Sequence, residues 1–156
     1  MAPDVLDAER RDFVGARRRA ILVTLSANGL PRPVPICFAL AEPDPDDGTT
    51  RLYSPLDEKP KRVADVRELA RVRDIVARPD VTLLFERWSE DWSQLAWLRA
   101  RGRSALLEPH DDVAAHSWAA QALRARYPQY RAHTLEDLPM LQIDITEATA
   151  WNVGPG

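Results

Sequence analysis

Apolar and polar residues alternate along several stretches of the chain, and this alternation is the clearest structural signal in the sequence. A period of two residues is typical of β-strands that bury one face. In AILVTLS (20–26), Ile21, Val23 and Leu25 alternate with Leu22, Thr24 and Ser26. The same reading, with turn signals between the runs, predicts six strands at 20–26, 32–41, 50–54, 81–88, 93–108 and 140–153.

Three intervening segments have helical character. Asp4 is a suitable N-cap for the first, with Asp7 as an imperfect capping-box partner. Pro79 ends the second, because the residue before a proline disfavours the helical conformation. The strands are joined by hairpins and not by regular βαβ units, which indicates a mainly β (α+β) fold, an antiparallel barrel with flanking helices. The expected helices are residues 4–18, 60–77 and 110–126.

Composition narrows the class of protein. The 156 residues suit a single domain (1–156), and a net charge of -3 gives no indication of a nucleic-acid partner. One cysteine excludes an intramolecular disulfide and a cysteine-rich zinc site. The sequence contains no apolar run of membrane-spanning length and no signal-peptide core at its start. We therefore expect a cytoplasmic protein without a membrane partner.

The strand over 32–41 carries an unusual proline pattern. Asn28-Gly29 predicts a hairpin turn before it, and Pro31, Pro33 and Pro35 then occupy alternate positions. Alternate residues direct their N–H groups to the same edge, so these prolines remove donors from one edge and leave the other free to pair. Protection against edge-to-edge aggregation explains this pattern, and so does a flat ligand or a second subunit along the bare edge.

Lys59 and Lys61 are the only two lysines among 21 basic residues, and they flank Pro60 and precede Arg62. Proline suits the first turn of a helix, which would place these cations at a helix N-terminus. Cations there oppose the helix dipole, whereas an anion bound between them and the free N–H groups would be stabilised. The alternatives are a phosphate site and a solvated loop.

No side chains stand out as a catalytic set. The chain has no nucleophile motif, and its three histidines have no ligand spacing with one another or with Cys37, which reads as a buried apolar residue. Among five tryptophans, Trp92 and Trp97 are candidates for packing or for stacking on a flat heterocycle. This absence suits a protein whose chemistry is carried by a bound cofactor.

The order of these motifs resembles a known family. ILVTLSANGLPRPVPICFAL, LYSPLDEKPKR, RPDVTLLFE and DWSQLAWLRARGRSALLE together resemble the pyridoxamine 5′-phosphate oxidase-like flavoproteins, most of all the branch that uses the deazaflavin F420. The resemblance covers about residues 8–152. The residues that bind pyridoxine phosphate in the true oxidases have no evident match here.

The resemblance implies a split β-barrel of six antiparallel strands in Greek-key order. It also implies a homodimer that holds two cofactors at its subunit interface. F420, or alternatively FMN, would lie with its rings along strand 32–38 and its phosphate at the lysine cluster, with a tryptophan contributed by the partner subunit. The implied cofactor-binding residues are Val34, Pro35, Ile36, Ser54, Lys59, Lys61, Arg62, Trp92 and Trp97.

Three functions are compatible with this resemblance. The first is an F420-dependent oxidoreductase that passes hydride between the cofactor and an unknown small-molecule substrate. The second is an FMN-dependent enzyme of the same fold. The third is a protein that binds a cofactor without turnover. In each case the protein would supply position and electrostatics, and we expect no catalytic side chain.

Overall fold

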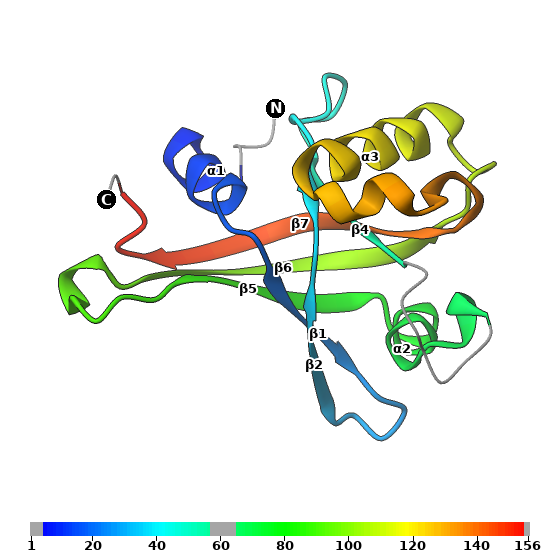
Figure 1. The fold of residues 1–156 in the computed structure, drawn as a ribbon. Helices are drawn as coiled ribbons and strands as arrows, with labels where there is room; N and C mark the ends of the chain where they lie inside the picture. The colour runs from blue at the N-terminus through cyan, green and yellow to red at the C-terminus, as the bar shows by residue number, and fades with distance from the viewer. Residues whose placement is uncertain (1–4, 57–64, 155–156) are drawn as a thin grey trace.

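The computed structural model describes residues 5–56 and 65–154 (Figure 1). Its centre is a curled antiparallel sheet of seven strands in the order β2-β1-β5-β6-β7-β4-β3. Helices α1 and α3 lie on one side of this sheet, and α2 lies beside the β1–β2 hairpin (Figure 1). The main elements are α1 (Ala8–Gly15), β1 (Ala20–Leu25), β2 (Pro31–Ile36), β3 (Ala39–Leu40), β4 (Thr50–Pro55), α2 (Ala70–Ala77), β5 (Asp80–Arg87), β6 (Ala96–Leu107), α3 (Val113–Arg126) and β7 (Met140–Trp151).

The sheet confirms the predicted class, a mainly β antiparallel fold with flanking helices and the form of a split barrel. Strands distant in sequence are neighbours in space, since β1 pairs with β5 and β4 pairs with β7. Alternation along β1 is strict, with Ala20, Leu22 and Thr24 buried and the residues between them half-buried. One face of the sheet therefore closes over the core, and the other faces outward.

The predicted strand over 32–41 is interrupted, which is why the sheet has seven strands and not six. β2 ends at Ile36, and the two-residue β3 begins at Ala39. Between them the chain changes neighbours, because β2 pairs with β1 whereas β3 pairs with β4. The backbone N–H of Phe38, instead of joining a ladder, donates to the Tyr127 hydroxyl at 3.2 Å.

The hairpin between β1 and β2 forms where Asn28-Gly29 predicted it, but by a different turn. Gly29 has φ of 76°, whereas Asn28 does not have a positive φ. Gly29 N–H donates to Ser26 O, and Ser26 N–H donates to Leu30 O. This is the bond pattern of a three-residue loop closed by a left-handed glycine.

The helices are shorter than predicted. α1 begins at Ala8, and its N-cap is Asp7, which accepts from the N–H of Arg10 at 2.9 Å. Asp4, the predicted cap, lies outside the described residues. The segment expected as a helix over 60–77 is broken at Leu69, whose extended ψ of 141° separates a short 3₁₀ turn from α2. α3 begins after Asp112, which caps it through Ala115 N–H.

Candidate functional site

Strand β2 has one paired edge and one open edge. It lies at the end of the sheet, and among the described strands it pairs only with β1. Pro31, Pro33 and Pro35 cannot donate, so the ladder to β1 must use the residues between them. The prolines therefore direct their carbonyl oxygens, and no N–H group, toward the open edge. The predicted one-sided pairing is confirmed, and the open edge carries hydrogen-bond acceptors only.

The residues expected to lie against a cofactor ring occupy the second half of this strand. Ile36 is buried in the core, Val34 packs against the core from a half-buried position, and Pro35 is exposed. The side chains of Val34 and Ile36 anchor β2, which leaves the backbone of the open edge as the surface that a ligand would meet. Their role in binding stays a prediction.

Ser54 lies beside the end of β2. It is buried on β4, and its hydroxyl donates to the carbonyl oxygen of Cys37 at 2.8 Å. This bond joins the segment that follows β2 to β4. The two strands lie near opposite ends of the strand order in the sheet. The structure thus brings Ser54 to the strand with which sequence analysis grouped it, with the proton of its hydroxyl already used inside the protein.

Lys59, Lys61 and Arg62 lie outside the described residues, so their predicted contact with phosphate stays a prediction. The next described residue is Asp65, which accepts from the backbone N–H of Arg67. The Arg67 guanidinium also binds Glu108 through two bonds of 2.7 Å each. This paired contact raises the pKa of Arg67 and lowers that of Glu108. The Arg67–Glu108 pair therefore fixes the chain just after residue 65 to the residue that follows β6.

A basic hollow that sequence analysis did not identify lies at the β1–β2 turn. It has a volume of about 300 Å³ and is bounded by the turn and by the C-terminal half of α2. Arg32, Arg73 and Arg78 line it, together with one carboxylate, that of Asp74. Two net positive charges remain, and Arg32 comes from the proline strand itself. The only sequence signal was Arg32 between two prolines, because Arg73 of α2 and Arg78 directly after α2 belong to no distinctive motif.

Trp92 and Trp97 lie far from Ser54 within one chain. Trp97 pairs with Trp151 near one end of the β6–β7 ladder, whereas β4 and Ser54 pair with the other end of β7. Leu107 follows Trp97 by ten positions along β6, a distance of about 30 Å along a strand. Trp92 is 72% exposed in the turn before β6. The chain alone does not join these rings to β2, and a partner's contribution stays a prediction.

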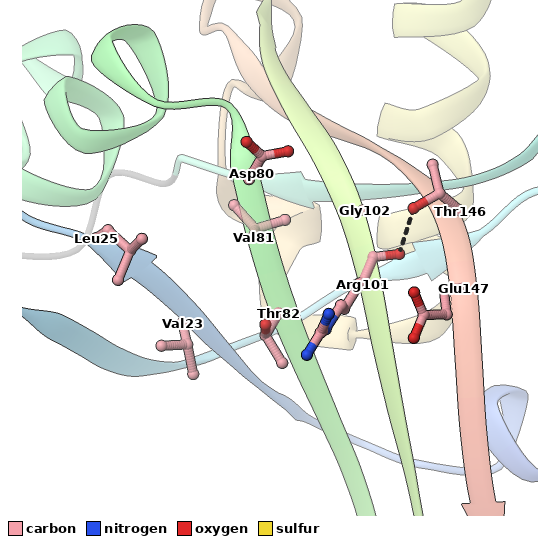
Figure 2. A pocket seen from close by; sticks show the side chains of 9 residues that line it. All are labelled: Val23, Leu25, Asp80, Val81, Thr82, Arg101, Gly102, Thr146 and Glu147. Atoms are coloured by element: carbon pink, nitrogen blue, oxygen red, sulfur yellow. Dashed lines mark hydrogen bonds between the residues drawn. The ribbon is translucent and has the colours of Figure 1, made fainter. Parts of the chain in front are cut away.

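A second hollow, of about 390 Å³, lies on the outward face of the sheet (Figure 2). Arg101 and Glu147 border it from neighbouring strands, and Val23 of β1 contributes an apolar side (Figure 2). It adjoins a bulge in β6, where the pairing with β7 shifts register between Arg101 and Gly102. A Cβ at Gly102 would lie 2.4 Å from the carbonyl oxygen of Asp144, so this close approach requires glycine.

Three other features of the described residues concern possible metal ligands, a buried histidine and the length of the helices. Within residues 5–56 and 65–154, no group of three or more His, Cys, Asp or Glu side chains could hold a metal ion. His116 is buried on α3 and bonds to the carbonyl oxygen of Leu138 at 2.7 Å. No helix in the described parts of the chain is long and apolar enough to cross a membrane.

Known proteins share this architecture. A conserved hypothetical protein of Mycobacterium tuberculosis is similar over 98% of this chain and 89% of its own, with a TM-score of 0.65 and 16% identity. A FAD-binding protein of Mesorhizobium loti is similar over 93% of this chain and 94% of its own, with a TM-score of 0.61 and 18% identity. The heme storage protein HutZ of Vibrio cholerae is similar over 94% of this chain and 93% of its own, with a TM-score of 0.61 and 12% identity. At these identities the likeness establishes the fold.

A search of curated proteins found no significant match. The model of the pyridoxamine 5′-phosphate oxidase family matches residues 6–152, nearly the whole chain. The motifs that carried the resemblance lie in this range, including the proline strand, Ser54 and the Gly102 bulge. The protein therefore belongs to the pyridoxamine 5′-phosphate oxidase family.

Proposed function

We propose that the protein is an F420-dependent oxidoreductase that acts on a small unsaturated or redox-active molecule. The observation that carries the proposal is the open edge of β2, which ends beside Ser54. The basic hollow lies at the opposite end of the same strand, where Arg32 lines it. A flavin or deazaflavin ring is flat and has an N–H donor for an acceptor-only edge, and its phosphate suits a hollow lined by arginines. When bound, the cofactor supplies the hydride chemistry, at C5 of F420 or N5 of FMN.

The residues of the chain bind and orient in this proposal. The backbone at Val34, Pro35 and Ile36 would lie along the ring. The phosphate would lie with the Lys59–Arg62 cluster near Ser54, whose hydroxyl would turn away from Cys37 to donate to it, or at the opposite end of β2 with Arg32 of the basic hollow. The resemblance favours F420 over FMN, because the motif order is most like that of the F420-using branch.

The proposal includes a homodimer formed through the outward face of the sheet. Half-buried Ile21 and Leu84 lie on this face with the Trp97–Trp151 pair, and Trp151 is 50% exposed. Arg101 and Glu147 lie opposite each other on the same face, so it carries both signs of charge and is complementary to a second copy of itself. A dimer would also allow one subunit's tryptophans to reach the other's β2. Sedimentation equilibrium tests this, since a monomer at micromolar concentration would contradict it.

Cofactor titration tests the central proposal. Purified protein is titrated with F420 and separately with FMN, and binding is followed by calorimetry and by the cofactor's absorbance. We expect F420 to bind more tightly than FMN. If neither cofactor binds at hundreds of micromolar, the proposal fails. Tight binding followed by reduction of no acceptor would favour the non-catalytic alternative.

An FMN-dependent enzyme is the second candidate, and one observation favours it. A protein of similar fold, from Mesorhizobium loti, is described as FAD-binding, which makes a flavin a reasonable ligand for this architecture. The heme storage description of the Vibrio cholerae protein supports the non-catalytic alternative in the same way. A yellow protein with a flavin spectrum after purification would decide for FMN against F420.

A further inference from the structure

Asp74 is a buried carboxylate at the point where α2 meets the β1–β2 hairpin. Its side chain is 7% exposed. The hydroxyl of Thr24, on β1, donates to its Oδ2 at 2.7 Å, and Nε of Arg32, on β2, donates to the same oxygen at 2.8 Å. Thr24 and Arg32 are directly opposite each other in the β1–β2 register. One oxygen atom of α2 therefore holds both strands of the hairpin.

A carboxylate in this position is expensive unless it is paired and hydrogen-bonded. Burial alone would raise the pKa of Asp74, but the bonds from Thr24 and Arg32 and the charges of Arg32 and Arg73 outweigh it and lower the pKa. Asp74 is therefore negatively charged at neutral pH. Stability alone gives little reason for such an arrangement, because replacing a whole buried ion pair by apolar residues is often neutral, whereas removing one partner is costly.

The pairing leaves the outer part of Arg32 free. Only Nε bonds to Asp74, and within the described part of the chain no hydrogen bond from Nη1 or Nη2 is found. The Arg32 side chain is 45% exposed and lines the basic hollow with Arg73 and Arg78. A guanidinium is planar, so fixing Nε also fixes the direction in which the two terminal nitrogens present their donors. Without Asp74, repulsion from the other two guanidiniums would favour rotamers that leave the hollow.

We propose that Asp74 is a positioning residue that directs the Arg32 guanidinium into the basic hollow, where it binds the phosphate of a ligand. The identification of that ligand as a flavin-type cofactor rests on the proposed function; the positioning role does not. Bidentate Arg–phosphate contacts are directional, so an Arg32 that rotates freely loses affinity even though its charge remains.

Inorganic pyrophosphate tests the positioning role without any cofactor. The full chain is titrated while the Nε–Hε signal of Arg32 is followed by NMR, with Arg32→Lys used to assign the signal. We expect Asp74→Asn to weaken pyrophosphate binding by about tenfold, the lower end of the loss when an orienting partner is removed at metal sites. The matched control is Thr24→Val, which removes the other donor and leaves Asp74–Arg32 intact; its affinity should equal that of wild type. Absence of an Arg32 shift in wild type, or unchanged affinity in Asp74→Asn, would overturn the inference.

A second arm separates positioning from general structural damage. FMN and riboflavin share their ring system, and only FMN has the phosphate. Asp74→Asn should weaken FMN and leave riboflavin unchanged, and it should have no further effect in an Arg32→Ala background. Equal losses for both compounds would refute positioning. If Asp74→Asn does not fold, Arg32→Lys carries the test, because it keeps the charge but not the directed fork; unchanged pyrophosphate affinity there would refute positioning. A loss of pyrophosphate affinity in Asp74→Asn, with no binding of FMN or F420 to wild type, would support the role of Asp74 and refute the proposed cofactor function.

Discussion

Replacing Tyr127 by Phe should loosen the chain immediately after the proline strand. The buried Tyr127 hydroxyl accepts from the backbone N–H of Phe38 at 3.2 Å and donates to the carbonyl oxygen of Arg18 at 2.9 Å. Without it, the N–H of Phe38 is left unpaired in the core, because Phe38 is fully buried. An unsatisfied buried donor costs about 1–3 kcal/mol, and the lost bond to the more accessible Arg18 carbonyl adds about 1 kcal/mol.

The expected loss in the free energy of unfolding is therefore about 2–4 kcal/mol, measured by urea denaturation with an unchanged m-value. For a chain of this size, each kcal/mol lowers the melting temperature by about 2–4 °C. Hydrogen exchange adds a local measurement, in which the amide of Phe38 should exchange faster than those of the β6–β7 ladder.

The control is Thr146→Val, which removes a hydroxyl that donates to the Arg101 carbonyl from an exposed position. It should cost less than about 0.5 kcal/mol, as is usual for surface substitutions. A loss below 1 kcal/mol in Tyr127→Phe, or a Phe38 amide that exchanges as in wild type, would refute the assigned role of the hydroxyl.

Three further outcomes are expected. Gly102→Ala should destabilise the fold by about 1–3 kcal/mol in urea denaturation, because its Cβ would overlap a backbone carbonyl of β7; an unchanged midpoint would contradict this. The bonds from Arg124 hold the pKa of Glu136 at about 2, below its ordinary 4.5, so this pair stabilises the protein above pH 4.5 and the contribution is lost as pH falls toward 2. Acid-unfolding curves of wild type and Glu136→Gln should therefore converge over that window; parallel curves would count against it. Changing Lys59 and Lys61 to Ala should weaken FMN or F420 by about 2 kcal/mol or more, and riboflavin not at all; equal affinities would remove both lysines from the site.

Most of the β-structure could be predicted because it depends on local pattern. The alternation in 20–26 survives as the buried and half-buried faces of β1, and the proline pattern correctly placed β2 at an edge. Two boundary errors have a physical origin. The strand over 32–41 reads as continuous because nothing local records that Phe38 bonds to a tyrosine 89 positions later. The segment 60–77 reads as one helix because the extended backbone at Leu69 is not signalled by residue type.

The candidate site was less predictable. The family resemblance brought Ser54 and the proline strand into one hypothesis, and the Ser54–Cys37 bond places them together. The basic hollow was missed because Arg32, Arg73 and Arg78 come from a strand and a helix about forty residues apart. Asp74 looked like any charged residue of an amphipathic helix until the fold buried it against Thr24.

The sequence by itself determined the acceptor-only edge of β2, because proline lacks an N–H wherever it stands. The need for glycine at position 102 comes from packing, because the Asp144 carbonyl of β7 occupies the place of a Cβ. Tertiary structure alone decided which charges act together. It brought the α2 carboxylate to Arg32 and separated Trp97 from Ser54 by the length of a strand. Hydrogen bonding along one strand is a local property of the chain, whereas the convergence of charged side chains depends on how distant segments pack.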